Sequence, residues 1–277
     1  MSMKLISNLL LSICFIIPSI SIAVGQTTEL KFGSVAMDIP AVMHRRLTPL
    51  TQYLSKKIGL QVNLKLSPNM SAAIKDVAKG SVDLAYLTPV AYLKAHKKGN
   101  ASILVKTVTN NKASFQLMIV VREGSEIKTI ADLEGKSFAF GDKAALLQRA
   151  VVVGAGVNLK KLGSYKFIGH YDNIVRGVMN KDFDAGILKD TKAFAWQKKG
   201  IRILHSSPHL PPYNIAVKGN LDHVIVKKLK QAFLDLDINK PEDKLVIKSL
   251  SNKYNGFAAT SDQEYDVVRK LIKPFEK

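Results

Sequence analysis

Two short stretches of this sequence contain residue types that bind phosphate or metal in other settings. Glu134-Gly135-Lys136-Ser137 matches the end of a phosphate-binding P-loop, but that motif needs glycine at position 130, which here is Ile130. His205 and His209 are four residues apart, but Pro208 between them argues against a helical metal pair. The sequence holds neither a Gly-x-Ser-x-Gly nucleophile elbow nor a His-Glu-x-x-His zinc motif. We therefore predict no enzyme, no metal site and no cofactor.

The remaining chemistry lies in five loops that follow expected strands and lead into expected helix N-termini. Ligands of open parallel sheets bind outside the carboxyl ends of the strands. Helix N-termini there present free N–H groups and a partial positive charge, which suit anions. One such loop is ordinary helix capping, but the five together predict a binding cleft. The loops span Val35–Pro40, Ser67–Ser71, Thr88–Tyr92, Asp142–Ala145 and Gly169–Asp172.

The elements that position these loops alternate between strand and helix from residue 30 onward. Leu47, Leu50, Leu54 and Ile58 share one face of a helix predicted over 43–58, which Gly59 ends. This alternation predicts an α/β fold with mainly parallel sheets covered on both faces. We predict strands over 30–35, 61–66, 82–87, 115–121, 137–140, 165–168, 185–188, 201–204 and 213–217, and further helices over 70–78, 89–96, 142–154, 171–179, 190–198, 222–236 and 262–275.

The first 25 residues have the pattern of a cleaved signal peptide. Lys4 precedes an apolar run over 9–17, Pro18 breaks that run, and Ala23 and Gly25 supply small residues before a cleavage site. An uncleaved membrane anchor is the alternative. Cleavage removes Cys14, the only cysteine, so the mature chain would hold no thiol nucleophile, Fe–S cluster or cysteine zinc site. We predict a periplasmic, exported protein.

The charge of the chain is strongly positive but dispersed. Its 277 residues carry 41 Lys+Arg against 22 Asp+Glu, a net charge of +19, and 47% of them are apolar, which excludes intrinsic disorder. The lysines come as scattered pairs rather than in one aromatic-lined patch, so we predict a solvated surface and no nucleic-acid partner. Such a field would still raise the encounter rate of an anionic ligand.

Several segments resemble the phosphonate/phosphite/phosphate substrate-binding proteins of ABC importers. The resemblance runs from about residue 30 to 250. It rests on Leu54-Ser55-Lys56-Lys57-Ile58-Gly59, on Gly80-Ser81-Val82-Asp83-Leu84-Ala85-Tyr86-Leu87-Thr88-Pro89-Val90-Ala91-Tyr92, on Ile130-Ala131-Asp132-Leu133-Glu134-Gly135-Lys136-Ser137-Phe138-Ala139-Phe140-Gly141-Asp142, on Gly169-His170-Tyr171-Asp172 and on Asp182-Phe183-Asp184-Ala185-Gly186.

This resemblance implies a two-lobe periplasmic-binding-protein fold of the Venus-flytrap type, with mixed, mainly parallel sheets. Two α/β lobes joined by two crossover strands close on a small ligand. After the signal peptide (1–25), lobe one would comprise 27–117 and 213–277, and lobe two 118–212. The crossover strands would be Gln116–Val121 and Pro208–Val217.

The family resemblance also implies a set of ligand-binding residues and shows one departure. Tyr92, His170 and Asp190 match site positions of the family. The family's usual loop carries Ser-Thr-Ser, whereas this chain has Lys143-Ala144-Ala145, which lacks the hydroxyls and predicts weak or absent phosphonate binding. Lys143 would partly substitute. Gln148 and Tyr171 are added from their position in the loops and not from the resemblance. The full predicted set is Met37, Met70, Thr88, Tyr92, Lys143, Ala144, Ala145, Gln148, His170, Tyr171 and Asp190.

Three functions fit these observations to different degrees. The first is an exported, monomeric solute-binding protein that delivers a small polar, anionic, phosphonate-like or phosphate-like ligand to an ABC permease. The alternative is a sensor module that reports a non-phosphonate ligand to a membrane signalling partner. An exported hydrolase would need an activated nucleophile with a base in reach, and the sequence offers no such set.

Overall fold

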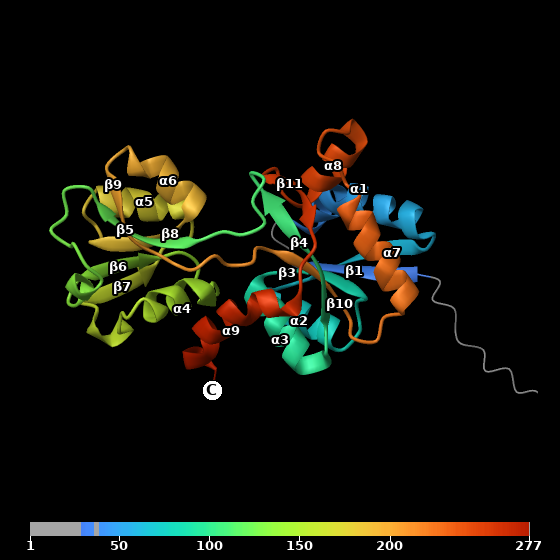
Figure 1. The fold of residues 1–277 in the computed structure, drawn as a ribbon, viewed down its shortest axis with the longest axis horizontal. Coiled ribbons are helices and arrows are strands. Elements are labelled where there is room, and N and C mark those ends of the chain that lie inside the picture. The colour runs from blue at the N-terminus through green and yellow to red at the C-terminus, as the bar shows by residue number, and fades with distance from the viewer. Residues whose placement is uncertain (1–28, 36–38, 277) are drawn as a thin grey trace, which may run out of the picture.

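The computed structural model of this chain describes residues 29–35 and 39–276. Within them, two α/β lobes lie side by side along the longest axis of the molecule, each built around one mixed sheet (Figure 1). The predicted signal peptide, Cys14 and Met37 lie outside the described residues. In the part of the chain that the structure describes, no helix is long and apolar enough to cross a membrane.

Lobe one contains a six-stranded sheet with the strand order β11-β4-β10-β3-β1-β2. Strands β1, β2 and β3 are parallel, whereas β10 runs antiparallel to both β3 and β4, and β11 antiparallel to β4. Its strands are β1 (Glu29–Val35), β2 (Gln61–Ser67), β3 (Leu84–Leu87), β4 (Ser102–Thr109), β10 (Asn214–Val217) and β11 (Tyr254–Ala258), and its helices are α1 (Pro40–Ile58), α2 (Met70–Ala78), α3 (Pro89–Gly99), α7 (His223–Leu234) and α8 (Pro241–Leu250).

Lobe two contains a five-stranded sheet with the strand order β7-β6-β8-β5-β9. Strands β6, β7 and β8 are parallel, and β5 runs antiparallel to its neighbours β8 and β9. The strands are β5 (Leu117–Arg122), β6 (Ser137–Phe140), β7 (Ser164–Phe167), β8 (Ala185–Lys189) and β9 (Ile201–Ser206), and the helices are α4 (Leu146–Gly154), α5 (Tyr171–Met179) and α6 (Asp190–Gln197).

Helix α1 shows how the sequence sets the elements. It begins at Pro40, three residues before the predicted start at Met43, because proline suits the first turn, where its missing N–H leaves no bond unmade. Gly59 ends it in the left-handed conformation with φ of 74°. The predicted apolar face is confirmed, since all of its members are buried: Leu47, Leu50, Leu54 and Ile58. The sequence patterns did not predict β4, β11 or α8.

Two extended connectors, residues 110–116 and 207–213, join the two sheets. Phe115 and Leu210 pair as an antiparallel bridge, in which each N–H donates to the other residue's carbonyl at 3.0 and 2.8 Å. The predicted crossover at 116–121 therefore lies too far along the chain, because β5 already belongs to the sheet of lobe two. The second predicted crossover likewise runs into β10 of lobe one.

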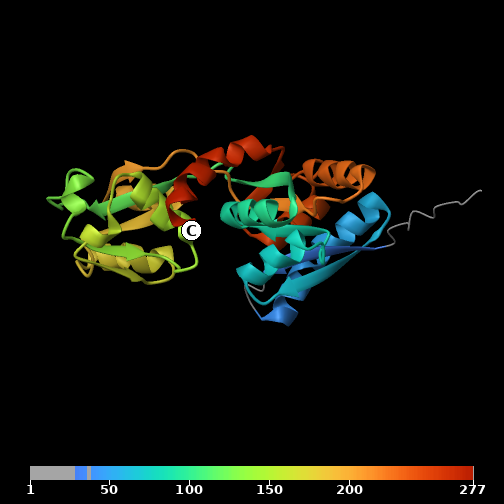
Figure 2. The ribbon, with the colours of Figure 1, turned by 90° about the horizontal axis from the view of Figure 1, so that it is seen from below.

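Residues 262–275, here called the strap, contact both lobes. The strap contains two short 3-10 turns (Asp262–Tyr265 and Lys273–Phe275) around helix α9 (Asp266–Ile272), which lies between the lobes (Figures 1 and 2). Its Tyr265, Val268 and Ile272 are buried in an apolar core that extends into both lobes. The sequence-based boundaries place this segment in lobe one, and in the structure α9 contacts α4 of lobe two as well as α3 of lobe one.

Candidate ligand-binding cleft

Four of the five predicted loops contribute residues to one region where the two lobes face each other, and the fifth, 35–40, lies partly outside the described residues. Thr88 caps α3 with its hydroxyl, which accepts a hydrogen bond from the Ala91 N–H at 3.2 Å, and Pro89 occupies the first turn of that helix. Across the gap, α4 and α5 begin after β6 and β7, and Gly169 makes the sharp entry into α5 with φ of 82°. The carboxyl ends of strands from both sheets therefore supply helix N-termini to one region.

This region contains a cleft of about 360 Å³. Lobe one, lobe two and the connectors all contribute side chains to it, so the cleft is an interlobe site. Nine of the fourteen described lining residues are apolar. The lining comprises Met70, Thr88, Pro89, Val90, Phe115, Leu117, Asp142, Ala144, Ala145, Leu146, Leu147, Gln148, Tyr171 and Tyr213.

Gln148 is the most constrained polar residue of the cleft. Its side chain is 6% exposed, and its Oε1 accepts the Gly141 N–H at 2.8 Å. Its Nε2 makes a long 3.5 Å contact to the Tyr171 hydroxyl. A Cβ at Gly141 would meet the Gln148 amide at 2.8 Å, so only glycine fits there. Residue 141 thus holds the Gln148 amide against the cleft wall.

The two tyrosines of the cleft act as neutral hydrogen-bond donors. Tyr213 stacks on Tyr86 with ring centroids 5.0 Å apart. Burial raises the pKa of Tyr213 and also that of Tyr171, which the neighbouring charge of Asp190 raises further while the Gln148 contact lowers it. Both hydroxyls therefore stay protonated over the physiological range and can donate to a ligand oxygen.

The charge of the cleft lining is negative rather than positive. Asp142 is its one ionisable carboxylate among the described lining residues, and its Oδ1 accepts the Ala144 N–H at 2.7 Å. None of the described lining residues is a lysine, arginine or histidine. An anion in this cleft would therefore depend on neutral donors and on the N-terminal turns of α3 and α4.

The structure brings six of the predicted site residues together in the cleft: Met70, Thr88, Ala144, Ala145, Gln148 and Tyr171. Lys143 and His170 are exposed and do not line it. Asp190 lines a smaller neighbouring cavity. Met37 lies outside the described residues.

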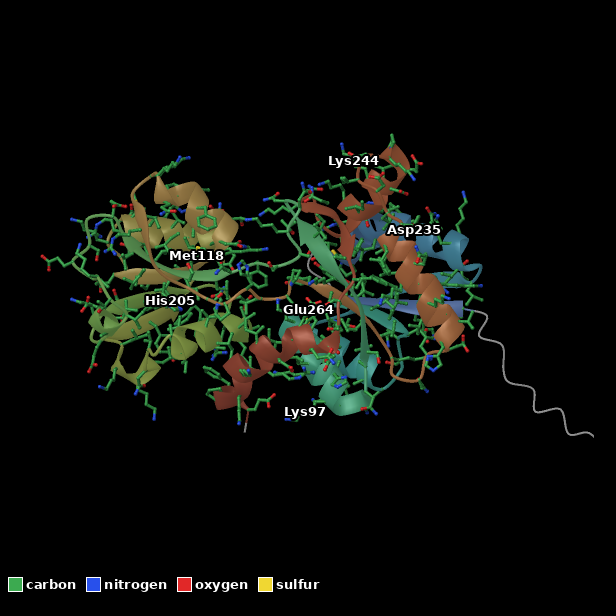
Figure 3. All side chains as sticks on the ribbon, viewed as in Figure 1. Lys97, Met118, His205, Asp235, Lys244 and Glu264 are labelled. Atoms are coloured by element: carbon green, nitrogen blue, oxygen red, sulfur yellow. The ribbon has the colours of Figure 1, made fainter. Side chains whose placement is uncertain are left out.

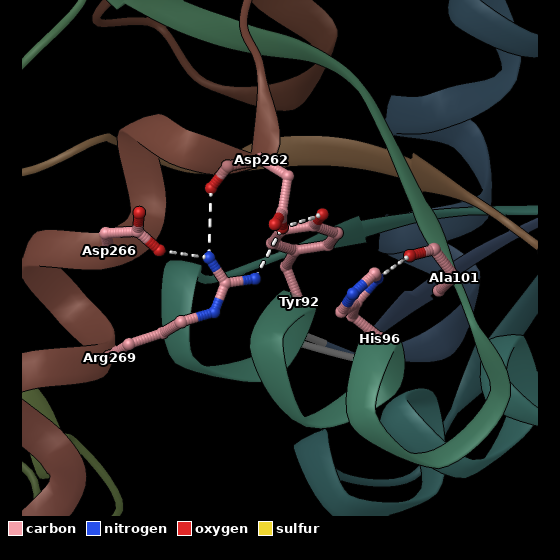
Figure 4. A network of polar contacts seen from close by, with 6 residues as sticks. All are labelled: Tyr92, His96, Ala101, Asp262, Asp266 and Arg269. Atoms are coloured by element: carbon pink, nitrogen blue, oxygen red, sulfur yellow. Dashed lines mark hydrogen bonds and ion pairs between the residues drawn. The ribbon is translucent and has the colours of Figure 1, made fainter.

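Tyr92 also departs from the prediction, because it is 1% exposed and faces the strap instead of the cleft. Its hydroxyl donates to Asp262 Oδ1 at 2.6 Å, and Asp262 in turn pairs with Arg269 at 2.6 Å (Figure 4). The Tyr92 ring packs edge-on against Tyr265 at 4.8 Å. Burial, and next the hydrogen bond to Asp262, raise the pKa of Tyr92. Tyr92 therefore joins α3 to the strap.

Sequence reasoning missed two connector residues of the cleft, Phe115 and Tyr213, and Leu117 at the start of β5. The crossovers themselves were predicted, but an extended segment alternates its side chains between two faces, and the sequence did not show which face the cleft uses.

His205 and His209 lie outside any helix, as the sequence predicted. His205 lies on β9 in lobe two (Figure 3), and the His209 ring lies 3.3 Å from the Ser114 hydroxyl on the other connector. Among the described residues, no three His, Cys, Asp or Glu side chains gather as metal ligands would.

Two α/β lobes, two paired connectors and a cleft at the carboxyl ends of the strands define a two-lobe substrate-binding protein. The family model described as "ABC transporter, phosphonate, periplasmic substrate-binding protein" matches residues 32–265. The chain belongs to this family, whose members bind substrates and are not enzymes.

One curated protein is similar to this chain in sequence, and two solved structures are similar to it in fold. The phosphonates-binding periplasmic protein of Escherichia coli is 24% identical over 98% of this chain and 85% of its own length. The structure of PhnD1 from Prochlorococcus marinus in complex with methylphosphonate has a TM-score of 0.67 and 20% identity, covering 90% of this chain and 98% of that one. XAC2383 from Xanthomonas citri bound to ATP has a TM-score of 0.74 and 18% identity, covering 90% and 100%.

Proposed function

We propose that this protein is exported by its N-terminal signal peptide and captures a small organic anion of the phosphonate or phosphate type for the permease of an ABC importer. The family and the relatives named above support transport, and the pattern of residues 1–25 supports export. The protein makes and breaks no bond. Its work is to bind the ligand better with the lobes closed than with the lobes apart.

The observation that carries the proposal is the combination of donors and apolar surface in the cleft. The oxyanion would lie at the N-terminal turns of α3 and α4, within reach of the Thr88 hydroxyl, the Gln148 amide and the Tyr171 hydroxyl. The carbon substituent would lie against Phe115, Leu117 and other apolar side chains. A ligand with a carbon substituent therefore gains contacts that inorganic phosphate cannot make.

Binding of the oxyanion itself should be weak. The loop at 143–145 lacks the hydroxyls of the family, and none of the described lining residues is a cation. Each hydrogen bond to a charged group contributes about 1.5–3 kcal/mol, and the Lys143-Ala144-Ala145 loop offers no side-chain hydroxyl. Each buried methylene contributes about 0.8 kcal/mol. We therefore expect affinity to come largely from the substituent, so that methylphosphonate binds weakly and longer alkylphosphonates bind better.

Titration calorimetry with methyl-, ethyl-, propyl- and butylphosphonate, alongside inorganic phosphate and sulfate, tests the proposal. We expect the affinity to rise by about fourfold for each added methylene. Phosphate and sulfate should bind more weakly than propylphosphonate. Binding of phosphate more tightly than every alkylphosphonate, or no binding of any oxyanion, would contradict the proposed ligand class.

A further inference from the structure

A second cavity of about 240 Å³, here called the side chamber, adjoins the cleft behind Phe115. It lies between the start of α6 in lobe two and the first connector, which follows β4 of lobe one (Figure 1). Phe115 lines both cavities. Tyr171 of the cleft is close enough to Asp190 of the side chamber for that carboxylate to raise the pKa of the tyrosine. The cleft and the side chamber are therefore adjacent, with the Phe115 ring between them.

The side chamber has the cations that the cleft lacks. Lys189, at the end of β8, and Lys112, on the first connector, both line it. The Lys189 ammonium lies over the Phe115 ring, 5.0 Å from its centroid, on the wall between the two cavities. Hydroxyl and amide groups surround these lysines, contributed by Thr109, Asn110, Ser114 and Thr191. These groups can all donate hydrogen bonds to an anion.

Lys189 is partly buried and lacks a close counter-ion. Within the described part of the chain, no carboxylate lies within 4.0 Å of its ammonium group. The adjacent Asp190 is committed elsewhere: one carboxylate oxygen accepts the Gln116 N–H at 3.0 Å and the other the Thr191 N–H at 2.7 Å. Burial lowers the pKa of Lys189, the charge of Asp190 raises it, and that of Lys253, from lobe one, lowers it. An anion in the chamber would offset the cost of burying this charge.

We propose that the side chamber is a cationic subsite of the same binding site, which takes a carboxylate or other second anionic group at the far end of an elongated ligand. The inference rests on the proposed function, since the phosphonate-type end of that ligand lies in the cleft. It narrows the substrate class from a simple alkylphosphonate to a molecule with two anionic ends separated by a short carbon chain. Phe115, between the cavities, would pack against that chain.

Two probes of equal carbon number separate this proposal from the proposed function. Propylphosphonate and 3-phosphonopropionate share a three-carbon skeleton and differ in a terminal methyl or carboxylate. By calorimetry, the native protein should bind 3-phosphonopropionate about tenfold more tightly than propylphosphonate, the gain of one charge-assisted hydrogen bond. Lys189→Met should reduce this preference to less than about twofold, and Lys189→Arg should retain it.

Lys199 offers a matched control. Its ammonium lies 5.6 Å from the Trp196 ring centroid, a similar lysine–aromatic contact beyond the opposite end of α6, and Lys199→Met should keep the full preference. Equal affinity of the native protein for the two probes, or a preference that survives in Lys189→Met, would overturn the subsite. If neither phosphonate binds, the proposed function fails by itself. Glutarate, which carries two carboxylates and no phosphonate, then tests the subsite by itself. Glutarate binding that is lost in Lys189→Met supports the subsite, and glutarate binding that is equal in the native protein and Lys189→Met refutes it.

Discussion

The Tyr92 hydroxyl donates a 2.6 Å hydrogen bond to Asp262 and thereby links residues 170 positions apart in the sequence. The bond connects α3 of lobe one to the strap. Further along the strap, Leu271 packs so closely on α4 of lobe two that a Cβ at Gly154 would lie 2.6 Å from it. The relative position of the two lobes therefore depends on the strap as well as on the two connectors.

Removing the Tyr92 hydroxyl should change stability rather than ligand affinity. In Tyr92→Phe the ring still fills its buried site, but the hydrogen bond to Asp262 is lost. We expect the free energy of unfolding to fall by about 1–2 kcal/mol, measured by urea denaturation. The affinity for propylphosphonate should stay within about twofold of the native value, because Tyr92 does not line the cleft.

Tyr165→Phe is the matched control for this change, because that ring is 42% exposed. Its unfolding free energy should stay within about 0.5 kcal/mol of the native value. A tenfold loss of affinity in Tyr92→Phe at unchanged stability would show instead that Tyr92 contacts the ligand, as the sequence predicted.

The Asp262 carboxylate should make the strap sensitive to acid. Burial alone would raise the pKa of Asp262, but hydrogen bonds from Arg269 and Tyr92, together with the Arg269 charge, hold it below its usual value. A carboxyl with a depressed folded pKa stabilises the fold above its unfolded pKa of about 3.9 and loses this contribution as the pH falls through the folded value. Stability measured by circular dichroism should therefore drop below about pH 4.

Asp262→Asn tests this assignment, since it removes the titrating group and keeps an oxygen for Tyr92. The variant should be less stable than the native protein at pH 7, and the difference should shrink toward pH 3. A difference that stays constant over this range would exclude Asp262 as a source of the acid sensitivity.

Two isosteric substitutions should move ligand affinity in opposite directions. Gln148→Glu keeps an acceptor for the Gly141 N–H but replaces the amide donor with a negative charge, so propylphosphonate affinity should fall by about tenfold or more. Asp142→Asn keeps an acceptor for the Ala144 N–H and removes a negative charge, so affinity should rise by several-fold.

Calorimetry at low and high salt completes this measurement, because the effects of these charges should shrink as salt screens them. Glu29→Gln, an exposed change on β1, serves as the control and should leave affinity unchanged. If both cleft variants bind like the native protein, the anionic end of the ligand does not lie in this cleft.

The local elements were largely predictable from the sequence, and the exceptions have physical reasons. Helix α1 has a clear apolar face and a glycine stop, so its pattern alone defines it. Strand β11 contains Gly256 with φ of 152° and pairs through an irregular register, so it lacks a strand-like pattern. The strand is held by pairing with β4, which the sequence does not display.

The cleft residues that lie in loops after strands were predictable from the sequence. The contacts made by segments far apart in the sequence were not. Thr88 and Gln148 follow from the rule that ligands bind beyond strand ends, and the structure places both in the cleft. Tyr92 lies one helical turn beyond Thr88. Its side chain is buried by the strap, which is far along the chain, so the sequence around Tyr92 does not show this burial. The sequence did not identify Lys189 as a site residue, because the chain has many lysines. The contact between its ammonium group and the Phe115 ring is visible only in the structure.

The position of β10 between β3 and β4 dictates an order of assembly. Lobe two is one continuous stretch of chain, so its sheet can form as soon as residues 117–206 have been synthesised. The sheet of lobe one has a vacancy until residues 214–217 arrive, because β4 reaches the parallel strands only through β10. Lobe one holds the first strand of the chain, and its sheet is nevertheless the last that can be completed.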